Sequence, residues 1–302
     1  MAPIALPALM RTFVANGIHL DSIRRDTSNC TTLKVHKIEL WGARINYLIL
    51  FAPQRISSAI TSRFLKEAKF ASAHPVGIGD TQSDRFLWFT PEQVMQTFGG
   101  VVDSQIIRNP DLPRILDTLG HNRLPRGLVG DPDELLEIHV TECLRFLMAS
   151  QARRYGSDRQ FESLPDGISL RVDGPNVQFD SKAYSGGYSV SADDIRRYES
   201  YVNEFNKKYG GNLGKVFSFL VISGRFKQSI GALRKRSENL YARCATPLSF
   251  ISAKELGQIT QSLMREPKLR NAIDWKVVFA ATKIESSRVM SQIRRIKKDK
   301  VL

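Results

Sequence analysis

The stretch LPDGISLRVDGPNVQFDSKAYSGGY, residues 164–188, decides how the middle of this chain folds. It contains two short apolar segments, 168–172 and 177–184, separated by Asp-Gly-Pro-Asn. Gly, Pro, Asn and Asp favour tight turns because they adopt or pre-set the required backbone angles. The stretch therefore predicts two antiparallel strands joined by a short connection.

The second of these strands has two different faces, because side chains alternate along a strand. Val177, Phe179 and Ala183 share one face, which is suited to burial against a helix. The other face carries Asp180 and Lys182, whose Cα atoms lie about 7 Å apart by strand rise. An acid and a base therefore stand side by side on one edge of the predicted hairpin.

Asp166 comes just before the first strand and can reach the same end of the hairpin. Two converging carboxylates repel each other unless a cation joins them. A hard ion such as Mg²⁺ suits oxygen ligands, and a lysine beside it can orient water and stabilise charge on a phosphate. The same residues also suit a structural interpretation, in which Asp-x-Lys is a solvated ion pair and Pro-Asp-Gly is a turn.

The surrounding sequence predicts an α/β domain with a mixed sheet flanked by helices. The expected order is helix 131–150, the hairpin, helix 191–208, strand 216–223, basic helix 225–241, strand 248–251 and a helix from 252. Helix starts are indicated by Asp131-Pro132, by the capping box at 191–194 and by Ser252.

The first 128 residues mix strand and helix patterns, and we expect a separate α+β N-terminal domain over 1–128. Residues 45–51 form an apolar run typical of a buried strand, and apolar residues at helical spacing follow over 56–68. Thr90 and Pro91 begin another helix, which Gly99-Gly100 should end. Four prolines between residues 109 and 132 indicate the domain boundary.

Composition favours a polyanionic partner. The 302 residues include 44 Lys+Arg and 30 Asp+Glu, a net charge of +14. Such a surplus indicates nucleic acid first and an anionic membrane surface second, with a merely soluble basic protein as the alternative. The three cysteines form no disulfide framework, and no apolar run reaches 18 residues. We therefore expect a cytoplasmic protein with no membrane span.

One segment is more specific than these patterns. PDG at 165–167 and DSKAYSGGY at 180–188 resemble the active-site block of the FokI-type cleavage domain of type IIS restriction endonucleases, within the PD-(D/E)XK nuclease superfamily. The similarity continues through ADDIRRY at 192–198 and FLVISGRFK at 219–227. It implies a restriction-endonuclease-like nuclease domain over 131–264.

This resemblance implies a metal-dependent endonuclease that hydrolyses phosphodiester bonds in double-stranded DNA. Asp166 and Asp180 would bind Mg²⁺, for which Mn²⁺ can substitute, and Lys182 would be the catalytic lysine. The backbone carbonyl of Ser181 would be a further metal ligand. Glu142, on the preceding helix, is a weaker candidate for the outer metal shell, since a solvated helix-surface glutamate explains it better.

The resemblance also implies an assembly, because one active centre of this type cuts one strand. Asp193 and Arg197 match an acid and an arginine that pair across a two-fold axis in the family. We expect a transient homodimer, or a partner subunit that supplies the second centre. The alternative for these two residues is an ordinary pair within one helix.

The C-terminal residues 265–302 form a basic extension with eleven Lys/Arg and four Asp/Glu, so 11 − 4 = +7. We expect this segment to contact DNA phosphates, unless it is only a solvated surface. The densest cluster consists of Arg294, Arg295, Lys297 and Lys298.

Three functions remain open from the sequence. The first is a Mg²⁺-dependent, site-specific type II deoxyribonuclease, IIS-like, of restriction or phage-defence type. The second is a nuclease subunit that is active only with a larger recognition partner. The third is a repair or RNA-directed nuclease on the same fold, since a fold alone does not determine the substrate. Residues 1–128 would bind DNA or a partner.

Overall fold

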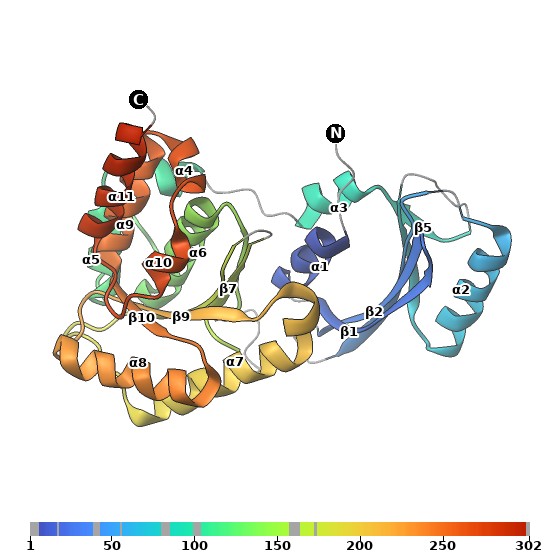
Figure 1. Cartoon of the computed structure of the whole chain (residues 1–302), viewed down its shortest axis with the longest axis horizontal. Helices are drawn as coiled ribbons and strands as arrows, with labels where there is room; N and C mark the ends of the chain where they lie inside the picture. The colour runs from blue at the N-terminus through green and yellow to red at the C-terminus, as the bar shows by residue number, and fades with distance from the viewer. Residues whose placement is uncertain are drawn as a thin grey trace. The chain divides into compact units, whose positions relative to one another are not determined.

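The computed structural model describes residues 6–16, 18–38, 43–54, 56–79, 85–98, 104–156, 164–171 and 174–299. The chain divides into two compact units, Met1–Gly100 and Val101–Leu302. Each unit contains its own five-stranded sheet (Figure 1). The two sheets are mixed and flanked by helices, which confirms the predicted fold class.

Unit 1 is an α+β unit whose sheet has the order β1-β2-β3-β4-β5. The first three strands are antiparallel neighbours, and β4 and β5 continue the sheet in parallel. The strands are β1 (Ile18–Thr27), β2 (Cys30–Ile38), β3 (Arg44–Phe51), β4 (His74–Ile78) and β5 (Leu87–Phe89). The helices are α1 (Leu6–Ala15), α2 (Ser58–Phe70) and α3 (Pro91–Phe98).

The predicted strand and the first predicted helix of unit 1 pack together. Ser57 caps α2, and Phe64 and Ala68 lie one turn apart on its buried face. They share a core with Leu48 and Leu50 of β3. The apolar residues at helical spacing in 56–68 are therefore the ones that pack α2 against β3. The expected stop of α3 at Gly99-Gly100 lies outside the described residues.

Unit 2 contains the stretch from which the fold was predicted, in a sheet of order β10-β9-β8-β7-β6. The predicted hairpin is present as antiparallel β7 and β8, while β8, β9 and β10 run parallel. The strands are β6 (Gln151–Arg154), β7 (Gly167–Leu170), β8 (Asn176–Lys182), β9 (Val216–Ser223) and β10 (Leu248–Ser252).

Helices cover both faces of this sheet (Figure 1). The helices α7 and α8 lie on one face, and α5, α6, α9, α10 and α11 pack with the other through one large apolar core. Their bounds are α4 (Ser104–Arg108), α5 (Leu112–Gly120), α6 (Pro132–Met148), α7 (Ala192–Leu213), α8 (Ile230–Cys244), α9 (Ala253–Met264), η2 (Pro267–Asn271), α10 (Trp275–Phe279) and α11 (Ser286–Asp299).

The segment 109–132, in which the domain boundary was expected, is part of unit 2. Leu112, Leu116 and Leu119 of α5 are completely buried in the core of unit 2. Pro113 is accommodated in the first turn, where a proline costs no helical hydrogen bond. The division after Gly100 therefore lies earlier than the boundary near residue 128 that the prolines indicated.

The C-terminal segment also differs from the expected extension. Trp275, Phe279, Val289 and Ile293 are buried in the same core as α5 and α9. The helices after residue 265 thus complete the apolar layer of unit 2. The basic helix begins at Ile230 rather than at residue 225, because Ser229 caps it. No helix among the described residues has the length and apolar character to cross a membrane.

Candidate active site

The predicted acid–base pair lies on β8, in the middle of the sheet of unit 2. Val177 and Phe179 are fully buried in the core beneath β8, so the alternating residues Asp180 and Lys182 turn to the opposite face. Asp166 immediately precedes β7 and is brought alongside by the antiparallel pairing of β7 and β8. The hairpin therefore unites residues that lie 16 positions apart, from Asp166 to Lys182.

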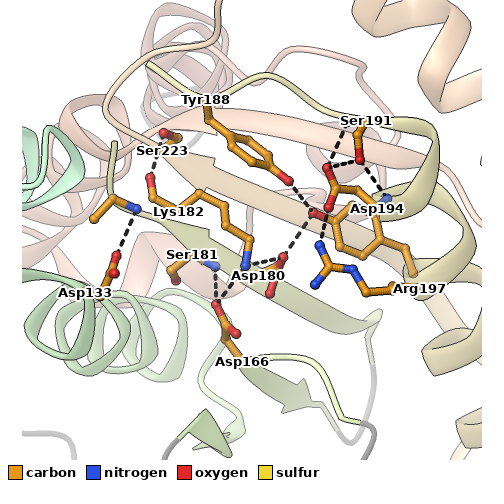
Figure 2. Close-up of polar contacts among 12 residues, drawn as sticks. Asp133, Asp166, Asp180, Ser181, Lys182, Tyr188, Ser191, Asp194, Arg197 and Ser223 are labelled. Carbon is orange, nitrogen blue, oxygen red and sulfur yellow. Dashed lines mark hydrogen bonds and ion pairs between the residues drawn. The ribbon is translucent and has the colours of Figure 1, made fainter. Parts of the chain in front are cut away.

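Hydrogen bonds and ion pairs hold these side chains together (Figure 2). The Nζ of Lys182 lies 2.7 Å from Oδ2 of Asp180 and 3.8 Å from Oδ2 of Asp166. The backbone N–H of Ser181 donates to the same Asp166 oxygen at 2.7 Å. The backbone around Asp166 is fixed as well, because its carbonyl accepts from the N–H of Tyr155 at 2.7 Å.

Burial makes the electrostatics of this cluster strong. Desolvation raises the pKa of Asp166 well above its usual value, and the negative charge of Asp180 adds to that rise. For Lys182, desolvation opposes the charged form, but the carboxylates of Asp180 and Asp166 outweigh it and raise the pKa. Lys182 is therefore a protonated donor at neutral pH.

Helix α6 contributes a third carboxylate that the sequence did not single out. Burial raises the pKa of Glu137 to about 7, although the positive charge of Arg154 opposes this rise. The charge of Lys182 also lowers the pKa of Glu137, and the charge of Asp180 raises it. Asp133, one turn earlier, accepts the backbone N–H of Ala183 at 3.2 Å. This face of α6 therefore lies against the end of β8.

Glu142 does not join these residues. Its carboxylate bonds Arg145 on the same helix, whose guanidinium also donates to the carbonyl of Ala152 at 2.7 Å. Five residues turn an α-helix by about 140°, so Glu137 and Glu142 cannot share one face of α6. Glu142 is buried, not solvated, and it helps to join α6 to β6.

Asp166 and Asp180 are the two carboxylates that contact Lys182. Among the described residues, no group of three or more His, Cys, Asp or Glu side chains is arranged to hold a metal ion. Asp166 and Asp180 offer hard oxygen ligands that repel one another. Mg²⁺ is usually held by one or two carboxylates while it keeps several waters. The two carboxylates therefore suit a hard divalent cation that keeps several waters.

The remaining predicted residues lie on other surfaces. Arg294, Arg295, Lys297 and Lys298 are all exposed on α11, and Lys297 pairs with Glu266. On α7, Asp193 and Arg197 are exposed, but they do not pair with each other in this chain. Asp193 bonds Arg196, and Arg197 bonds Asp194.

Two site residues were missed for different reasons. Glu137 follows Asp133 by one helical turn, and that spacing is a signal the sequence does contain. Tyr198 of α7 donates to Oδ2 of Asp180 at 3.0 Å. Nothing in the local pattern distinguishes its hydroxyl from that of any other tyrosine on an amphipathic helix.

Comparison with known proteins identifies the family of the domain that holds these residues. The family model described as "FokI, cleavage domain" matches residues 127–281, just over half of the chain. The type II restriction enzyme FokI of Planomicrobium okeanokoites is 31% identical over 123 residues, which are 36% of this chain and 20% of that enzyme. The matched segment thus spans about a fifth of its curated relative.

Two solved structures are also similar. The structure of restriction endonuclease FokI matches 51% of this chain and 28% of its own, with 23% identity and a TM-score of 0.42. The structure of FokI bound to DNA matches 68% of this chain and 38% of its own, with 20% identity and a TM-score of 0.45. By the family model that matches residues 127–281, the chain belongs to the FokI cleavage domain family.

Proposed function

We propose that this protein is a divalent-metal-dependent, site-specific DNA endonuclease of restriction type, similar to type IIS enzymes. The observation that supports it is the convergence of Asp166, Asp180 and Lys182 within a domain of the FokI cleavage family. In this proposal the two aspartates, with the backbone carbonyl of Ser181, hold Mg²⁺, and Mn²⁺ can substitute. The bound ion would supply Lewis-acid stabilisation of charge on the scissile phosphate.

Lys182 is the side chain through which the protein itself would assist phosphodiester cleavage. The carboxylates of Asp180 and Asp166 raise its pKa and favour the ammonium form in the metal-free protein. In that form Lys182 can donate hydrogen bonds to an attacking water or to a phosphate oxygen. Its Nζ is held at 2.7 Å from Asp180, so the donor is already oriented before substrate binds.

Cleavage of supercoiled plasmid tests this proposal. Purified protein should produce nicked and linear DNA in Mg²⁺ or Mn²⁺ and none in excess EDTA. Asp180→Ala should abolish cleavage while the circular dichroism spectrum and Tm remain those of a folded protein. An Asp180→Ala variant that cuts plasmid as fast as the wild type contradicts the assignment.

A nuclease subunit that needs a recognition partner is the second candidate. The family model that matches the chain is that of a cleavage domain, so target recognition can come from unit 1 or from a partner. In that case the protein alone leaves plasmid intact in every metal, and cleavage appears only when a partner is added. The metal and the three site residues would be needed in both cases.

Unit 1 is proposed to select the DNA target or to bind that partner. It is a separate compact unit, so it can evolve independently of the cleavage domain. Sequencing the ends of cleaved plasmid tests the first role. A fixed offset from a recurring sequence supports target selection by the protein, and randomly distributed ends contradict it.

A further inference from the structure

The hydroxyl of Tyr198 is buried against the catalytic carboxylate. It donates to Oδ2 of Asp180 at 3.0 Å, and the side chain of Tyr198 has no solvent exposure. The ring stacks on Phe219 of β9, with centroids 4.2 Å apart. Packing therefore fixes the ring, and the fixed ring holds its hydroxyl at one oxygen of Asp180.

That oxygen receives two donors. The Nζ of Lys182 reaches Oδ2 of Asp180 at 2.7 Å, and the Tyr198 hydroxyl reaches the same atom from α7. Two donors on one oxygen restrict rotation of the carboxylate about its terminal bond, which is otherwise a soft torsion. The Asp180 carboxylate is thereby held by groups from both β8 and α7.

Tyr198 is itself anchored to the first turn of α7. Ser191 and Asp194 form a capping box there, with the N–H of Asp194 donating to the Ser191 hydroxyl at 3.0 Å. The hydroxyl of Tyr188 is 3.4 Å from that of Tyr198. Bonds from Tyr188, Ser191 and Arg197 outweigh burial and lower the pKa of Asp194.

The hydroxyl protons of Tyr188 and Tyr198 equal in number the carboxylates of Asp194 and Asp180 that accept them. Tyr188 bonds Asp194, which leaves the single proton of Tyr198 for Asp180 at the shorter distance. Tyr198 therefore joins α7 to β8 through Asp180, while Tyr188 bonds Asp194 in the first turn of α7.

We propose that Tyr198 is a positioning residue that orients the Asp180 carboxylate for metal binding. This inference rests on the proposed nuclease function. Hydrogen-bond partners of metal-ligating carboxylates typically contribute roughly 10–100-fold to metal affinity or activity. Tyr198→Phe removes one oxygen and keeps the stacked ring, so it isolates the hydrogen bond.

The test is a titration with Mn²⁺, followed both by isothermal calorimetry and by plasmid cleavage. Tyr198→Phe should raise the dissociation constant for Mn²⁺ and the Mn²⁺ concentration that gives half-maximal cleavage by about tenfold. A merely structural loss would reduce the folded fraction and lower the rate equally at every Mn²⁺ concentration. Only a role at the metal site shifts the half-saturation point.

Tyr209→Phe is the matched control, because Tyr209 is buried on the same helix, eleven residues or about 16 Å further on. It should leave both Mn²⁺ values unchanged. Equal Mn²⁺ binding and cleavage by Tyr198→Phe and wild type overturn the inference. A wild type that binds Mn²⁺ but never cuts DNA counts against the proposed function instead, and calorimetry then still decides the role of Tyr198.

Discussion

The ammonium group of Lys182 contacts the Asp180 carboxylate two residues earlier on the same strand, at 2.7 Å from Oδ2. Side chains at such positions share one face of β8, so the contact follows directly from strand geometry. The same Nζ lies 3.8 Å from Asp166. One lysine therefore offsets the repulsion between two carboxylates and presents a charged donor at the same point.

Lys182→Ala should lower the single-turnover rate of DNA cleavage by roughly 10²–10³-fold, the usual cost of removing one preorganised donor from a reacting centre. Binding of Mg²⁺ should persist, because both aspartates remain. Rapid-quench cleavage and calorimetry measure the two quantities separately. Lys215→Ala is the control, since Lys215 is exposed next to the opposite end of the parallel pair β8–β9. A loss below tenfold would contradict a direct role for Lys182.

Glu137→Gln should stabilise the metal-free protein at high pH. The pKa of Glu137 is raised from 4.5 to about 7, mainly by burial, so the folded state disfavours its ionised form. Its contribution to stability is present below pH 4.5 and is lost as pH rises toward 7. The loss is at most roughly 3 kcal/mol, from 1.36 kcal/mol per pKa unit.

Urea unfolding at several pH values measures this difference between wild type and variant. Glu137→Gln should be the more stable protein above pH 7, and the two curves should converge near pH 4.5. Glu142→Gln, on another face of α6, breaks the contact with Arg145 and should destabilise at both pH values. A Glu137→Gln variant that loses stability at pH 8 would show that the carboxylate is stabilising when ionised.

The hairpin and its neighbours were predictable because their signals are local. Alternation placed Val177 and Phe179 in the core and Asp180 outside it, and the capping box at Ser191 set the start of α7. The helix α5 was missed because the prolines between residues 109 and 132 indicated a domain boundary. Its apolar spacing of four and then three residues, ending at Leu119, was the competing signal, and tertiary burial decided the outcome.

The site was only partly predictable for a related reason. Asp166, Asp180 and Lys182 lie within one hairpin, so their meeting follows from local pairing. Glu137 and Tyr198 approach from helices on opposite faces of the sheet, and only the packing of α6 and α7 brings them there. No periodicity within β8 contains that information.

Arg294→Gln together with Arg295→Gln should weaken DNA binding similarly for all sequences and flatten its salt dependence. Each lost phosphate contact changes the slope of log K against log salt by about 0.9 on duplex DNA. Substitution is the proper test, because Val289 and Ile293 anchor α11 in the core and a deletion would expose it. The paired control is Lys207→Gln with Lys208→Gln, exposed on α7. Equal slopes for both pairs would make α11 a solvated surface.

The assembly prediction concerns α7. Asp193 and Arg197 are both more than half exposed, at 74% and 56% of their side chains, and they bond other residues within the chain. Because both side chains are largely exposed, they can exchange these bonds for a reciprocal pairing across a two-fold axis. In that pairing, Asp193 of one copy contacts Arg197 of the other. Asp193→Arg and Arg197→Asp should each prevent linearisation of plasmid and leave nicking, because like charges then meet at both contacts.

Mixing the two single variants gives the sharper test of this contact. In the mixed dimer, an arginine faces an aspartate at both reciprocal positions, and every active centre is intact, so linear product should return. Arg197→Asp also removes a partner of Asp194, and circular dichroism must show that α7 persists. Lys207→Asp makes the same charge change further along the helix and should cut as wild type does. Linearisation by both single variants at wild-type rates, over a range of protein concentrations, would exclude this helix as the contact and leave a partner subunit as the source of the second centre.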